Sequence, residues 1–71
     1  MRASDLIVGE SYRHKDNPTY CYAKVIKVLK PKEAENTHNK IIVKCEYSQD
    51  KNGSFGLIKY FEPSDLIKEN S

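Results

Sequence analysis

Apolar residues occupy every second position between residues 40 and 47, and the positions between them are mostly polar. One face of this segment carries Ile41, Val43, Cys45 and Tyr47, and the other carries Ile42, Lys44 and Glu46. An alternation of this period is typical of an antiparallel strand with one buried face. The pattern therefore predicts a half-buried strand over residues 40–47.

A second, longer strand is predicted over residues 20–29, which read YCYAKVIKVL and are rich in β-branched and aromatic side chains. The apolar pattern changes face midway, because Ala23 and Val25 share one side whereas Ile26 and Val28 share the other. Either both faces are partly covered, or a bulge at Val25-Ile26 switches the buried face. A bulge of this kind is how a small sheet curls into a barrel.

Polar segments separate these strands from their neighbours. Residues 11–15 suit a first short strand, and residues 16–19 cluster turn formers around Pro18. Residues 30–39 are polar throughout and indicate a loop, with room for one helical turn at 32–35.

The return strand, residues 55–61, follows Asn52-Gly53, a hairpin signal because both residues accept a positive φ at low cost. Its register is open. A two-residue turn at Asn52-Gly53 brings Ile58 and Tyr60 inward, and a shift of one residue brings in the opposite face. Because the opposite face carries more apolar bulk, we expect its residues to point mainly inward. They are Phe55, Leu57 and Phe61.

The order of elements predicts an all-β fold in which residues 1–71 form one domain, a small five-stranded antiparallel barrel. A short 3-10 turn is expected near Pro63-Leu66, since proline suits the first position of a helical turn. From Gly9 to Ile67, this order resembles the SH3-like small barrels, a class that includes Tudor and KOW-type modules. The segments VGESYRHKDNPTYCYAKVIKV and FGLIKYFEPSDLI also resemble short uncharacterised proteins of phage and prophage genomes.

The tetrapeptide SDLI occurs twice, at residues 4–7 and 64–67. The residues after the two copies differ completely, so the copies do not mark a repeat array, which recurs at a fixed short period. Ser and Asp favour hydrogen-bonded turns, and the Leu and Ile that follow are expected to enter the core. We therefore predict that Leu6 and Leu66 are both buried and that the chain ends lie close together.

Composition excludes several classes of protein. Apolar blocks such as Ile41-Ile42-Val43 are far too short for a membrane span of about 20 residues, and residues 1–5 do not lead into a signal-peptide core. The net charge of +2 is below the excess typical of nucleic-acid-binding proteins. The two cysteines, Cys21 and Cys45, are too few for a disulfide scaffold. We expect a cytoplasmic protein with free, buried thiols and no cofactor.

The most obvious candidate metal ligands are spaced as His-x6-Cys twice: His14, Cys21, His38 and Cys45. Structural zinc sites usually pair ligands about two to four residues apart, which these residues do not do. We therefore predict no metal site. A Cys21–Cys45 disulfide conflicts with the inferred reducing compartment. The sequence also contains no nucleophile elbow, phosphate-binding glycine loop or HExxH helix, so no catalytic residue and no enzymatic activity are predicted.

Basic and aromatic residues form the candidate partner-binding set, which comprises Tyr12, Arg13, Tyr20, Tyr22, Lys24, Lys44, Lys59 and Tyr60. Such rings could line a groove for a peptide. Alternatively, tyrosines beside lysines are how small barrels stack single-stranded nucleic acid. The same residues also suit solvated lysines and core tyrosines, and acidic neighbours weaken any positive field. The sequence favours a binding or accessory module for a protein or peptide, with nucleic acid as the alternative and a monomer or homodimer as the assembly.

Overall fold

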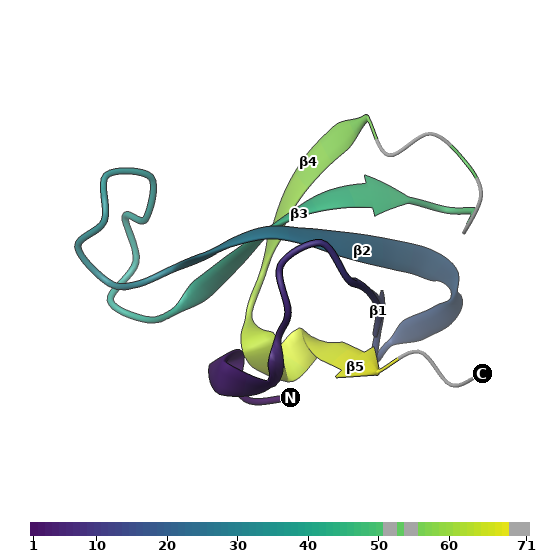
Figure 1. Cartoon of the computed structure of the whole chain (residues 1–71), viewed down its shortest axis with the longest axis horizontal. Coiled ribbons are helices and arrows are strands. Elements are labelled where there is room, and N and C mark those ends of the chain that lie inside the picture. The colour runs from purple at the N-terminus through teal and green to yellow at the C-terminus, as the bar shows by residue number, and fades with distance from the viewer. Residues whose placement is uncertain (51–52, 54–55, 69–71) are drawn as a thin grey trace.

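The computed structural model describes residues 1–50, 53 and 56–68, and five antiparallel strands form one open sheet in the order β4-β3-β2-β1-β5 (Figure 1). The strands are β1 (Ser11–His14), β2 (Asn17–Leu29), β3 (Ile42–Ser48), β4 (Leu57–Phe61) and β5 (Leu66–Lys68). Helical structure in these residues is limited to two 3-10 turns, η1 (Ala3–Asp5) and η2 (Pro63–Asp65). The prediction of an all-β chain is thus confirmed, and η2 begins at the predicted proline.

The longest strand, β2, contains a bulge, which was one of the two alternatives for its change of apolar face. Its pairing with β3 shifts register between Val25 and Lys27, leaving Ile26 without a partner on β3. Val25 is opposite Cys45 before the shift, and Val28 packs against the same core after it. Because the bulge inserts one residue, the positions that face the core change from odd-numbered to even-numbered. Apolar residues therefore face the core on both sides of the bulge.

The core lies on one face of the sheet, which we call the inner face. The buried residues of this core are Leu6, Tyr12, Ala23, Val25, Val43, Cys45 and Leu66, and Met1, Val28 and Phe61 pack against them. Val43 and Cys45 confirm the alternation predicted for β3, but Ile41 precedes the strand and is exposed. Ile42 is instead buried on the outer face, directly opposite Leu29.

The turn predicted at residues 16–19 is wrong in its extent, because β2 begins at Asn17 and this residue pairs with His14. The chain reverses at Lys15 and Asp16, and the backbone N–H of Asp16 donates to His14 Nδ1 at 3.1 Å. The residue before a proline is biased towards extended backbone, so Pro18 favours the start of a strand here rather than a turn.

In the β3–β4 hairpin, Tyr47 is opposite Leu57 and Cys45 is opposite Lys59. This is the register that the sequence favoured, with Leu57 and Phe61 on the inner face. Phe61 packs against the core as predicted, but Leu57 is 62% exposed because its end of β4 extends beyond the core. Asn52 and Phe55 lie outside the described residues.

The loop between β2 and β3 contains no helical turn at 32–35, and a single polar side chain holds it in place. Asn36 is buried, and its Nδ2 lies 3.1 Å from the carbonyl oxygen of Leu29, 3.1 Å from that of Lys30 and 2.8 Å from that of Lys40. The polar pattern indicated a loop here but did not identify Asn36, whose buried amide satisfies backbone carbonyls.

Both SDLI copies form 3-10 turns whose leucines, Leu6 and Leu66, are buried, as predicted. The α-amino group of Met1 donates to the carbonyl oxygens of Pro63 at 3.3 Å and Leu66 at 3.2 Å, so the first residues pack beside η2 (Figure 1). The prediction that the following isoleucines enter the core is wrong, since both are exposed. The backbone after each turn is extended, so the side chain that follows the buried leucine points in the opposite direction.

Candidate functional site

The residues predicted to bind a partner do not form one surface. Tyr12 lies in the core, where its hydroxyl accepts a hydrogen bond from the backbone N–H of Ile7 at 2.9 Å. Tyr20 is exposed near the start of β2. Lys24 is exposed on the outer face, opposite Glu46 of β3. Tyr12 therefore offers no ring surface for stacking, whereas Tyr20 and Lys24 remain accessible.

Arg13 and Tyr22 form a cross-strand pair on the outer face. The guanidinium carbon of Arg13 lies 4.8 Å from the centroid of the Tyr22 ring, and Nη2 donates to the Tyr22 hydroxyl at 3.0 Å. Nη1 donates to the carbonyl oxygen of Pro18 at 2.6 Å. Arg13 thereby covers a buried tyrosine and fastens the β1–β2 turn, which gives the pair a structural role.

Lys44 and Tyr60 meet on the outer face, where a loop carboxylate joins them. Lys44 Nζ is 2.8 Å from Glu35 Oε2, and the Tyr60 hydroxyl is 3.5 Å from the same oxygen. The hydrogen bond from Lys44 lowers the pKa of the Glu35 carboxyl, and the bond to Glu35 raises the pKa of Lys44. The positive charge of Lys44 is therefore compensated within the protein.

The four candidate metal ligands are not gathered into a site. The His14 ring lies 5.4 Å from the Phe61 ring, and the backbone N–H of His38 donates to Asn36 Oδ1 at 2.9 Å. Burial raises the pKa of the Cys21 thiol. It raises the pKa of the Cys45 thiol to about 12. Within the described part of the chain, no three His, Cys, Asp or Glu side chains come close enough to hold a metal ion.

The sequence analysis did not identify the edge strand β4 as the most exposed apolar element of the sheet. Leu57 is 62% exposed on the inner face, and Ile58 and Tyr60 are 46% and 51% exposed on the outer face. In the sheet, β4 is bordered by β3 on one side only. Residues 57–61 have apolar side chains on both faces of the strand, and this pattern is the sequence signal that could have identified β4 as an exposed apolar strand.

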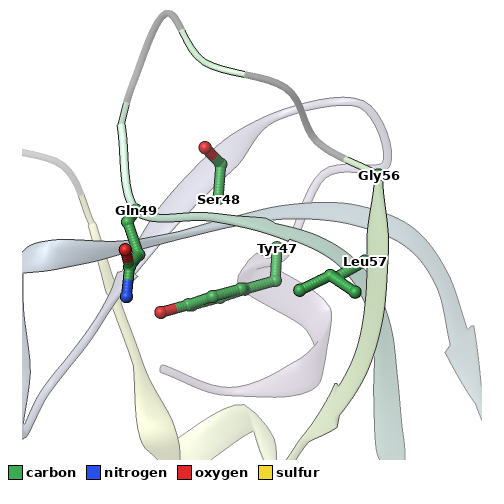
Figure 2. Close-up of a pocket in the computed structure, with 5 residues that line it drawn as sticks. All are labelled: Tyr47, Ser48, Gln49, Gly56 and Leu57. Atoms are coloured by element: carbon green, nitrogen blue, oxygen red, sulfur yellow. The ribbon is translucent and has the colours of Figure 1, made fainter.

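A hollow opens at the end of the β3–β4 hairpin, beside β4. Figure 2 shows the side chain of Leu57 next to the Tyr47 ring, with Gln49 near the hydroxyl end of that ring. Ser48 and Gly56 complete the lining. Mostly apolar walls of this kind suit a side chain from a neighbouring strand better than a charged small molecule.

The opposite edge of the sheet is different in kind. β5 has three residues, Leu66–Lys68, and its first residue is buried. The α-amino group of Met1 donates to the carbonyl oxygen of Leu66 at 3.2 Å. A strand this short, with its first carbonyl already hydrogen-bonded, offers few groups for further strand pairing, and β4 is two residues longer.

No known protein family, curated protein or solved structure matches this chain. No helix in the described residues is long and apolar enough to cross a membrane.

Proposed function

We propose that this protein is a non-enzymatic binding module that takes up an extended segment of a partner protein along β4. The observation that carries this proposal is the terminal position of β4 together with exposed Leu57, Ile58 and Tyr60. An edge strand presents every second backbone N–H and C=O outward, and an added strand pairs with these groups while its side chains contact the neighbouring ones.

The architecture we propose is that of an SH3-like small barrel. The strand order β4-β3-β2-β1-β5, the bulge in β2 and the 3-10 turn before β5 support it. A bulged central strand allows the two ends of a small sheet to curl towards each other.

The free thiols of Cys21 and Cys45 agree with the cytoplasmic location expected from the sequence. The resemblance to phage proteins stays a prediction that genomic neighbourhood can test.

A protein segment is favoured over nucleic acid because of how the basic and aromatic residues are used. Tyr22 is covered by Arg13, and Lys44 is paired with Glu35. Single-stranded nucleic acid needs accessible rings beside uncompensated cations. Lys24 and Lys27 on the outer face and Lys59 on the inner face remain exposed, and such binding would act through these lysines.

Selection from a displayed library of random peptides, followed by NMR titration of the labelled protein, tests the proposal. We expect selected peptides to shift the amide signals of β4 and Tyr47. Leu57→Ser should weaken their binding, whereas Ile7→Ser should not. The two side chains are matched in exposure, at 62% and 61%, but Ile7 lies outside β4.

Two results would contradict the proposal. The first is a selection that yields no peptide whose binding maps to β4. The second is binding of short DNA or RNA oligomers at low salt that shifts Lys24 and Lys27 and weakens steeply as salt rises, because displaced counterions give that dependence.

A further inference from the structure

Lys59 lies in the middle of β4 and on its inner face, between Leu57 and Phe61. Its side chain is exposed, and its Nζ lies 4.3 Å from the centroid of the Tyr47 ring. Tyr47 is on β3, so this cation–π contact holds the ammonium over the inner face of the β3–β4 pair, next to the edge strand. A strand that pairs with β4 would therefore meet a fixed positive charge at the centre of an otherwise apolar inner face.

This charge has no acidic counterpart among the residues that the structure describes. The carboxylates closest to β4 in the sequence or sheet are otherwise engaged or face away: Glu35 binds Lys44 at 2.8 Å, and Glu62 binds Lys40 at 3.1 Å. Glu46 is opposite Ile58 on the outer face. Among the described residues, no carboxylate therefore compensates the charge of Lys59 at the centre of the edge strand.

We propose that the partner strand carries an acidic residue opposite Lys59, with apolar residues two positions to either side. The apolar residues would face Leu57 and Phe61, since directly opposed side chains in antiparallel strands point to the same face. This inference rests on the proposed function and adds the chemistry of the partner. A carboxylate in that position would compensate the charge of Lys59, which none of the described carboxylates pairs with.

A second copy of the chain fits β4 less well. The register that pairs all of Leu57–Phe61 with the same strand of another copy sets Lys59 opposite its own counterpart. Like charges directly opposite each other destabilise a strand pair, and lysine on an edge is a common device against self-association. The central lysine therefore disfavours a homodimer and favours an acidic partner.

Repeating the peptide selection with Lys59→Glu tests this inference, with Lys27→Glu as the matched control. Both variants reverse one lysine charge, but Lys27 is on the central strand β2, opposite Lys44. Wild type and Lys27→Glu should enrich peptides with an acidic residue between two apolar ones. Lys59→Glu should enrich a basic residue at that position. For acetyl-TTVTETVTT-amide, we expect Lys59→Glu to weaken binding by about fivefold, as for an exposed ion pair.

The outcomes separate the two proposals. Peptides that bind along β4 in wild type without any preference for an acidic residue overturn the inference and leave the proposed function intact. A wild-type protein that pairs with itself through β4, seen as a dimer in sedimentation and lost in Leu57→Ser, also overturns it. Failure of wild type to select any β4-binding peptide overturns the function and the inference together.

Discussion

The two SDLI segments have the same sequence and form the same local turn. Asp5 N–H donates to the Arg2 carbonyl at 3.0 Å, and Asp65 N–H donates to the Glu62 carbonyl at 2.9 Å. The aspartate side chain then accepts from the backbone N–H at the start of the turn, at 3.3 Å in the first copy and 3.1 Å in the second. In the described residues, the adjacent serine side chains make no hydrogen bond, so the turn depends on the aspartates.

The surroundings of the two turns differ. Leu66 is 0% exposed and Leu6 is 9% exposed, while the isoleucines that follow them are 37% and 61% exposed. The second copy continues directly into β5, whereas the first leads to a chain reversal at Gly9, which has a φ of +93°. The tetrapeptide thus specifies the turn, and the elements packed around it decide how much burial follows.

The largest predicted difference concerns the two leucines. Leu66→Ala should lower the free energy of unfolding by about 3–4 kcal/mol and Leu6→Ala by about 2 kcal/mol, because Leu66 leaves the more enclosed cavity. Urea denaturation followed by circular dichroism measures both.

Each leucine variant serves as the control for the other, since the chemical change is the same. A loss in Leu6→Ala equal to or greater than that in Leu66→Ala would show that the first turn is as well packed as the second. If Leu66→Ala does not fold, a comparison of Leu66→Val with Leu6→Val ranks the two positions with a smaller loss of stability in each variant.

The second prediction concerns the aspartates that close the turns. Asp65→Ala should destabilise the protein by about 1–1.5 kcal/mol and Asp5→Ala by about 0.5 kcal/mol, as for loss of a capping side chain. Asp65 has the larger effect because it also lies 3.7 Å from Lys15 Nζ. The matched controls, Ser64→Ala and Ser4→Ala, should change stability little. A serine variant as costly as its aspartate neighbour would contradict the geometry of the turn.

Local chemistry made much of this fold predictable from the sequence. Turn-forming residues predicted the buried leucines, and the change in apolar parity near Val25 made the bulge one of two alternatives for β2. The errors arose where distant elements decide the outcome. Whether Ile67 or Leu57 is buried depends on what covers each end of the sheet. The anchoring of the loop by Asn36 depends on the carbonyl at the end of β2 and on another that precedes β3.

The candidate site was less predictable than the fold. Residue types suggested a basic and aromatic surface, but Arg13 covers Tyr22 and Glu35 binds Lys44, which are pairings that no linear pattern reveals. The edge at β4 required the strand order, because the same apolar residues in a central strand would be covered by a neighbour.

The third prediction uses the isoleucines that follow the turns. Ile67→Ala should cost about 0.5–1 kcal/mol, whereas Ile7→Ala should stay within about 0.5 kcal/mol of wild type. Ile67 pairs with Arg13 in the sheet, but Ile7 lies outside any strand. Thermal unfolding at matched pH compares the two. Equal losses of stability in the two variants would mean that the pairing of β5 with β1 does not make the Ile67 side chain more important for stability than that of Ile7.

The smallest predicted effect separates the turns by charge. Lys15 and Asp65 form an ion pair at 3.7 Å between partly exposed side chains, and Asp5 has no ion pair among the described residues. A double-mutant cycle of Lys15→Met with Asp65→Asn should give a coupling of about 0.3–0.5 kcal/mol, typical of an exposed pair. The coupling should fade in about 1 M salt, where the screening length is about 3 Å. The same cycle with Asp5→Asn should give none, and a coupling of equal size there would show that Lys15 acts on both turns through the general charge of the protein.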